Sequence, residues 1–150
     1  MDDMTTFTPI QPGDLLPDDE SLLALAEFLH HGVRPRMRSL WFALLGPRRR
    51  LLPVIAQFEE LPAEPGVPFV AQLGRIWADA APPAPAPPAS IVLMLERPGA
   101  EAVQDSDRVW RAALHAAAAE SGIEVAGFFL ATADGVRPLT PDDARPRRGR

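Results

Sequence analysis

The chain has 150 residues, 47% of them hydrophobic, which is enough for one buried core and argues against a wholly disordered protein. Its formal net charge of −5 argues against a protein whose main task is to grip nucleic acid or an anionic membrane. Cysteine is absent, which excludes disulfides, a thiol nucleophile and thiolate metal sites.

No apolar run reaches the roughly 18 to 20 residues that a transmembrane helix needs. The start of the chain carries Asp2 and Asp3, where a secretory signal would be basic. We therefore expect a soluble, cytoplasmic protein with no membrane partner. Lysine, asparagine and tyrosine are missing, and alanine, proline, arginine and glycine are abundant. This bias is typical of a GC-rich coding sequence and indicates an actinobacterial source.

The first half of the chain begins with residues 1–17, whose prolines and lack of hydrophobic period predict an extended arm. A helix is predicted over residues 19–31, because acids at its start suit the positive helix end and leucines recur at helical spacing. Residues 39–45 are apolar on both alternating faces. Such a strand is covered on both faces, or covered on one and used for association on the other. In the second case Trp41 and Leu45 are candidate interface residues.

A second strand is predicted over residues 51–58, as the partner of the first in a hairpin. Pro53 cannot donate a ladder hydrogen bond, which favours an edge position or an irregular start. A helix follows over about residues 68–79. Residues 81–89 contain only alanine and proline and predict a polyproline-type spacer. An SH3-type ligand is the less favoured alternative for this segment.

The second half of the chain follows the order strand, polar loop, helix, strand and hairpin. The strands are predicted over residues 91–95 and 125–130, and the helix over 106–121. A turn at Asp134 leads into the last strand, and residues 144–150 predict a disordered basic tail.

The whole order is α-β-β-α-β-α-β-β. It predicts one α/β (α+β) domain over residues 18–143, with a single mixed sheet flanked by about three helices. The spacer does not divide two domains, since neither half alone has enough strands to complete a sheet.

A candidate ligand site lies where the strand over residues 91–95 ends. Glu96 and Arg97 follow this strand, and Asp105 and Asp107 open the next helix. Open sheets usually place ligands at the carboxyl ends of their strands, so these four side chains are candidate ligand-binding residues. Arg97 could hold a carboxylate or phosphate through two hydrogen bonds. The alternative is a Glu–Arg ion pair in solvent, which contributes little energy.

The sequence offers no catalytic pattern. Its three histidines lack the i, i+4 spacing of a metal pair, and no serine lies in a Gly-x-Ser-x-Gly elbow. Phosphate-binding glycine loops are also missing. We therefore expect no catalytic residue, no metal and no cofactor.

A strand that ends in a loop with Pro98, before a helix that opens with Asp107, resembles the JAB/MPN (JAMM) superfamily, above all its RadC-like branch. The resemblance covers about residues 39–139. It implies a zinc hydrolase fold in which two histidines and an aspartate bind the metal. Leu95 and Arg97 stand where those histidines would be, and Asp107 is one residue short of the family aspartate. The resemblance therefore implies a metal-free relative.

Two functions are the main candidates on this basis, and a JAMM-type metallo-hydrolase is the third. The first is a non-enzymatic interaction or scaffold module that binds itself as a homodimer or binds another protein, because apolar pattern is in surplus while catalytic groups are missing. The second is a small-ligand or anion-binding protein, or a weak enzyme, that uses the loop after Leu95. Binding of nucleic acid through the arginine-rich turn and tail is the least favoured interpretation.

Overall fold

The structure is a computed structural model that describes residues 10–80 and 90–140. The predicted spacer over residues 81–89, the tail over 144–150 and the first nine residues of the predicted arm lie outside the described residues. The elements are α1 (Asp19–His30), β1 (Ser39–Leu45), the short turn η2 (Pro47–Arg49), β2 (Leu51–Phe58), α2 (Val67–Ala80), β3 (Ser90–Glu96), α3 (Asp105–Glu120), β4 (Glu124–Thr132) and β5 (Gly135–Pro138). The predicted fold class and element order are confirmed.

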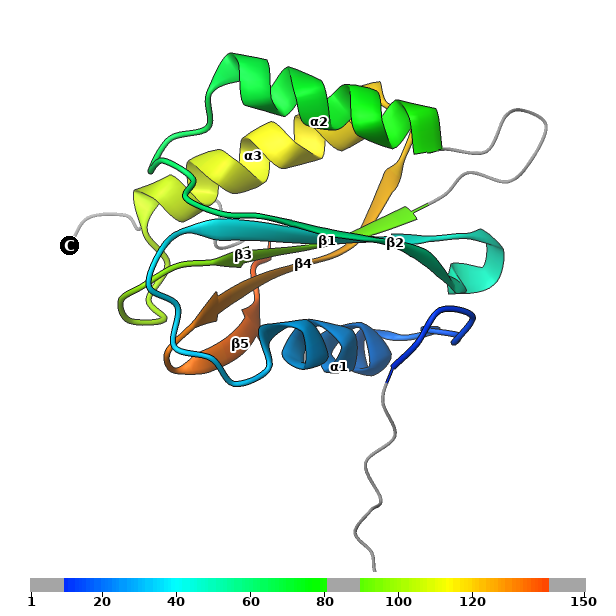
Figure 1. The fold of residues 1–150 in the computed structure, drawn as a ribbon, viewed down its shortest axis with the longest axis horizontal. Helices are drawn as coiled ribbons and strands as arrows, with labels where there is room; N and C mark the ends of the chain where they lie inside the picture. The colour runs from blue at the N-terminus through cyan, green and yellow to red at the C-terminus, as the bar shows by residue number, and fades with distance from the viewer. Residues whose placement is uncertain (1–9, 81–89, 141–150) are drawn as a thin grey trace, which may run out of the picture.

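The sheet has five strands in the order β2-β1-β3-β4-β5. The β1–β2, β1–β3 and β4–β5 pairs are antiparallel, and β3–β4 is parallel. A parallel pair needs a crossover connection, and α3 provides it between β3 and β4. Figure 1 shows α2 and α3 on one face of the sheet and α1 on the other. The sheet is therefore mixed and covered from both sides.

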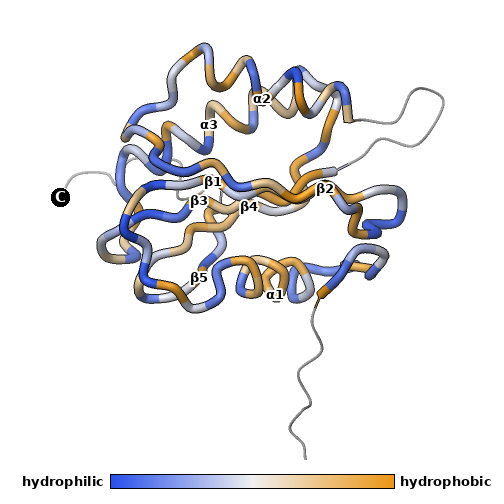
Figure 2. Tube along the Cα trace, in the orientation of Figure 1, coloured by the Kyte–Doolittle hydropathy of each residue, from blue (hydrophilic) through white to orange (hydrophobic). Residues whose placement is uncertain are grey.

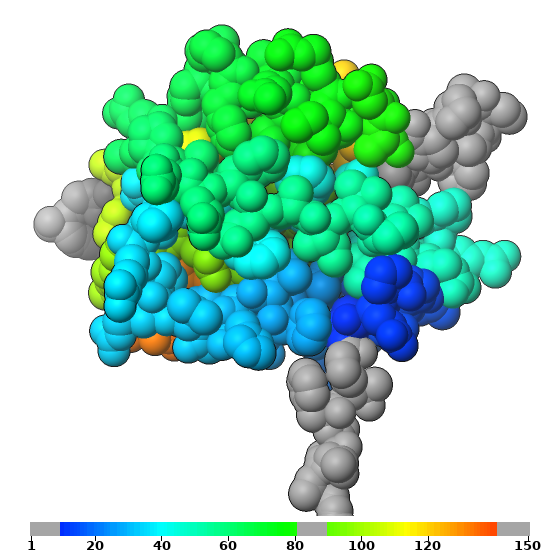
Figure 3. All heavy atoms as spheres, in the orientation of Figure 1, coloured from blue at the N-terminus to red at the C-terminus, as the bar shows by residue number. Residues whose placement is uncertain are grey.

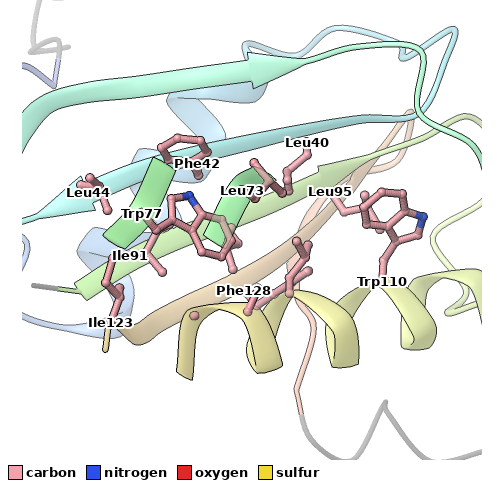
Figure 4. Packing of buried hydrophobic residues seen from close by; sticks show 14 of the residues in the cluster. Leu40, Phe42, Leu44, Leu73, Trp77, Ile91, Leu95, Trp110, Ile123 and Phe128 are labelled. Carbon is pink, nitrogen blue, oxygen red and sulfur yellow. The ribbon is translucent and has the colours of Figure 1, made fainter. Parts of the chain in front are cut away.

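The central strand β3 is buried along its whole length, which explains its continuous run of apolar residues. Ile91, Leu93 and Leu95 pack toward α2 and α3, whereas Val92 and Met94 pack on the side of α1. The larger of the two clusters also contains the fully buried indoles of α2 and α3, whose positions Figure 4 shows: Trp77 and Trp110. Figure 2 shows hydrophobic residues concentrated along the strands.

The helix α1 begins with a reciprocal pair of hydrogen bonds. The Asp18 carboxylate accepts from the Ser21 backbone N–H at 2.9 Å, and the Ser21 hydroxyl oxygen accepts from the Asp18 N–H at 3.1 Å. These bonds satisfy two donors that the first turn of a helix leaves without partners. The bond from the Ser21 N–H lowers the pKa of Asp18 below its ordinary value.

The described part of the predicted arm lies against the start of β2. The Gly13 N–H donates to the Leu51 carbonyl at 2.7 Å, and the Leu51 N–H donates to the Asp14 carbonyl at 2.8 Å. Leu15 forms a bridge with Arg50. The arm therefore covers the outer edge of β2 at its first residue.

Candidate functional site

The loop after β3 places Arg97 inside the protein, with 1% of its surface exposed. Its Nε and Nη2 atoms donate to the two Asp107 carboxylate oxygens at 2.8 and 2.9 Å. Its remaining N–H groups donate at 2.8–2.9 Å to three loop carbonyls, those of Pro98, Ala100 and Ala102. Because a guanidinium carries five N–H donors, all of them are used.

In this geometry Arg97 is not available to bind the ligand predicted for it. The guanidinium has no donor left for a carboxylate or phosphate, and Asp107 is fully buried and also accepts from the Gln104 N–H at 2.8 Å. The pair instead ties the loop over residues 97–104 to the first turn of α3. In this conformation the role of both residues is to order that loop.

Glu96 lies on the opposite face of the sheet, beside the end of α1. Its two carboxylate oxygens contact His30 Nδ1 at 2.8 Å and the Ser39 hydroxyl at 3.0 Å. All three residues are at most 8% exposed. Asp105 is separate again, because its side chain is 93% exposed and accepts from Arg108. The four candidate ligand-binding residues therefore do not form one site.

Sequence reasoning missed His30 and Ser39 as the partners of Glu96. Glu96 lies between the other two, so the Ser39 hydroxyl donates to a carboxylate and not to an imidazole. In a serine nucleophile the hydroxyl proton must instead be taken by an adjacent base, which is usually histidine. The burial of Ser39, at 2% exposure, also keeps a substrate away. This cluster connects α1 to the sheet.

Among the described residues, no group of three or more His, Asp or Glu side chains is placed so that it could hold a metal ion. Leu95, which stands at the place of a JAMM ligand, is a fully buried core residue. The resemblance to the JAB/MPN superfamily stays a prediction.

Leu45 lies in the core on the side of α1 and is 0% exposed, so in this conformation it cannot form part of a surface. It was predicted as an interface residue because both faces of its strand are apolar, and the structure covers both faces at that end. Trp41 is different, since it is only partly buried. Its indole Nε1 is buried and has no hydrogen-bond partner among the described residues.

The outer edge of β2 is an open strand edge of the described part of the chain. No described strand lies beyond it, and the arm reaches only its first residue. Natural edge strands are usually protected by charged residues, prolines, bulges or covering segments. Here Pro53 and a register shift opposite β1 protect the start. The stretch over residues 54–58 contains no charge.

Alternate side chains of this stretch face different surroundings. Val54, Ala56 and Phe58 pack partly against the large core cluster, while Ile55 and Gln57 are exposed on the side of α1. Ile55 is 39% exposed. In Figure 3 the turquoise atoms of this region lie on the face toward the viewer. Helix α1 packs mainly against β3, β4 and β5, so Ile55 and Gln57 remain exposed.

The opposite edge of the sheet contains a hollow of about 530 Å³. It arises because β5 pairs only with residues 129–132 of β4, so the first half of β4 has no described strand beside it. Its walls combine apolar side chains of α1, β4 and the segment after β5 with Asp19, Glu20, Arg111 and His115. Burial, and secondarily the Arg111 charge, lower the pKa of His115.

Comparison with known protein families, with curated proteins and with solved structures found no match. Within residues 10–80 and 90–140, no helix is both long and apolar enough to cross a membrane.

Proposed function

We propose that this chain is a non-enzymatic, cytoplasmic interaction module that associates with itself. The observation behind this proposal is the open edge of β2, where residues 54–58 combine apolar side chains with unprotected backbone groups. An exposed edge of this kind is a template for pairing with another strand, and a monomer would gain from covering it.

Further support comes from the buried ionisable side chains near the end of β3. Arg97, Asp107, Glu96 and His30 are buried and bonded to one another or to the backbone. They therefore stabilise the fold at the end of β3, and little reactive chemistry is left in the loop where sheets usually place it.

Light scattering coupled to size-exclusion chromatography tests the proposal. The full-length chain at tens of micromolar should have about twice the mass of the 16.3 kDa monomer. A monomer across that concentration range would contradict self-association.

A second candidate function is the binding of a small ligand in the hollow beside β4. Its volume of about 530 Å³ falls within the range of roughly 300–1,000 Å³ of ligand sites, and its walls are mainly apolar with a few charged groups. A thermal-shift screen of amphipathic amines and carboxylates would test it. A ligand of this site should lose its stabilising effect in His115→Trp, which fills the hollow, and retain it in the exposed control Val109→Trp.

A further inference from the structure

We infer that two copies of the chain pair through antiparallel β2 strands around a twofold axis beside Ala56, which forms one continuous ten-stranded sheet. This inference rests on the proposed function, and it specifies the surface, the partner and the register. Closed twofold dimers are the commonest assemblies of soluble homo-oligomers, and their interfaces use the same patch on both subunits.

The length of the open edge determines where the axis lies. The arm occupies the backbone groups of Leu51, and Pro53 has no N–H to donate. The stretch that remains is residues 54–58, and its centre is Ala56. A twofold axis there places Val54 opposite Phe58 of the second copy, and Ile55 opposite Gln57.

This register is compatible with the two faces of the sheet. Directly opposed residues of antiparallel strands point to the same face, so a self-pairing strand must match residues of the same alternation. Val54, Ala56 and Phe58 share one face, and Ile55 and Gln57 share the other. The β-branched Val54 meets the aromatic Phe58, which is a favourable cross-strand pair.

Charges at the two ends of β2 favour the antiparallel direction. The strand is preceded by the basic turn Arg48, Arg49 and Arg50, and it is followed by Glu59 and Glu60. Antiparallel pairing places the acidic end of one copy about two residues, or roughly 7 Å along the strand, from the basic end of the other. Parallel pairing would place like charges together. The central stretch contains no charge, so self-pairing there meets no repulsion.

The strand contact alone would be smaller than a stable interface, which buries about 800 Å² per partner. The partly exposed side chains beside the edge can supply further area. Trp41 lies opposite Gln57 in the β1–β2 register, and Ile55 is its neighbour on the same face. Pairing would place Ile55 of the second copy beside these residues, on the same face of the sheet.

Single cysteines test this register, because the chain contains none of its own. Opposed residues have Cβ atoms about 4.5–5.5 Å apart, which is near disulfide range, whereas diagonal residues are about 7–8 Å apart. Ala56→Cys should therefore form an intermolecular disulfide under mild oxidation at least about tenfold faster than Ile55→Cys or the distant exposed control Val109→Cys. Faster cross-linking of Ile55→Cys would overturn the register.

A second variant distinguishes failure of the proposed β2 interface from failure of self-association as a whole. Ile55→Glu places a carboxylate diagonal to its own copy and to Glu59 of the second chain, so the dimer dissociation constant should rise at least about tenfold. Val109→Glu is the matched control, because Val109 is also exposed, at 47%, and lies on α3. A wild-type dimer that survives Ile55→Glu, with Ala56→Cys cross-linking no faster than Val109→Cys, would overturn the β2 interface and leave the proposed function intact. A wild-type monomer would overturn both.

Discussion

Arg97 and Asp107 form a buried bidentate ion pair, with Nε–Oδ1 and Nη2–Oδ2 distances of 2.8 and 2.9 Å and both side chains at most 1% exposed. The pair joins the loop after β3 to the first turn of α3. It takes the place where an open sheet would usually offer a ligand site, and it uses every donor of the guanidinium. Removal of one partner leaves the other charge buried and uncompensated.

Asp107→Ala should lower the free energy of unfolding by about 3–5 kcal/mol, since an uncompensated buried charge carries a penalty of that size. The control Asp105→Ala, two residues away in the same helical turn, removes an exposed carboxylate from an exposed pair and should cost about 1 kcal/mol or less. Urea unfolding of both variants gives the comparison. Equal losses would show that helix capping, and not the buried pair, explains the effect.

Glu96→Gln tests the cluster that joins α1 to the sheet. The carboxylate contacts both His30 and Ser39, and an amide cannot accept at both positions. The amide must instead donate from its NH2 group to the Ser39 oxygen or to His30 Nδ1, and a charge-assisted bond becomes a neutral one, so we expect a loss of about 1–2 kcal/mol. Glu101→Gln, at an exposed loop position, should change the free energy of unfolding by less than about 0.5 kcal/mol. A neutral effect of Glu96→Gln would remove the structural role given to this cluster.

His115 should make the protein less stable in mild acid. Its pKa in the folded chain lies below the ordinary value of 6.5, because burial and the Arg111 charge disfavour the imidazolium. As the pH falls below about 6.5, the unfolded chain binds a proton that the folded chain resists, so the free energy of unfolding falls until the folded pKa is reached. Above 6.5 this contribution is absent.

His115→Phe should remove that pH dependence and keep an aromatic ring against Phe128. In the wild type the imidazole stacks on Phe128, with the two ring centroids 5.8 Å apart. The measurement is the free energy of unfolding at pH 7.5 and pH 5.5. Wild type should lose more stability between these values than the variant does. All other titratable groups are common to both proteins, so their contributions cancel in the difference. An identical loss in both would show that His115 titrates normally.

Reversal of the two negative charges that follow β2 should weaken the dimer. Glu59→Arg combined with Glu60→Arg brings like charges to the basic turn of the second copy, and we expect the dimer dissociation constant to rise severalfold at low salt. The effect should shrink as ionic strength increases, because exposed charges are screened within about 10 Å at 0.1 M salt. Glu120→Arg, at an exposed position of α3, is the control for net charge. Analytical ultracentrifugation at two salt concentrations provides the readout.

The fold could be predicted from the sequence because its elements follow hydrophobic periodicity closely. The strand bounds predicted at residues 39–45 and 51–58 agree with β1 and β2, and the helix predicted at 106–121 agrees with α3 within one residue at each end. Local patterns of this kind are strong where apolar residues recur at the strand or helix period.

The site could not be predicted because it depends on contacts between distant segments. Arginine in a polar loop is usually exposed, and nothing near Arg97 in the sequence shows that three loop carbonyls converge on its guanidinium. His30 and Ser39 lie 66 and 57 residues from Glu96, respectively, and only the β1–β3 register brings Ser39 opposite Glu96. Leu45 shows a related limit, because an apolar face does not reveal which element covers it.

Hydrogen exchange of the β2 amides at different protein concentrations is the most direct test that two copies meet at this edge. If they do, the outward-facing amides among residues 54–58 will exchange more slowly at high concentration and faster on dilution below the dissociation constant, while the amides of β3 remain unchanged. Exchange at β2 that is independent of concentration, in a sample that light scattering shows to be dimeric, would contradict the account.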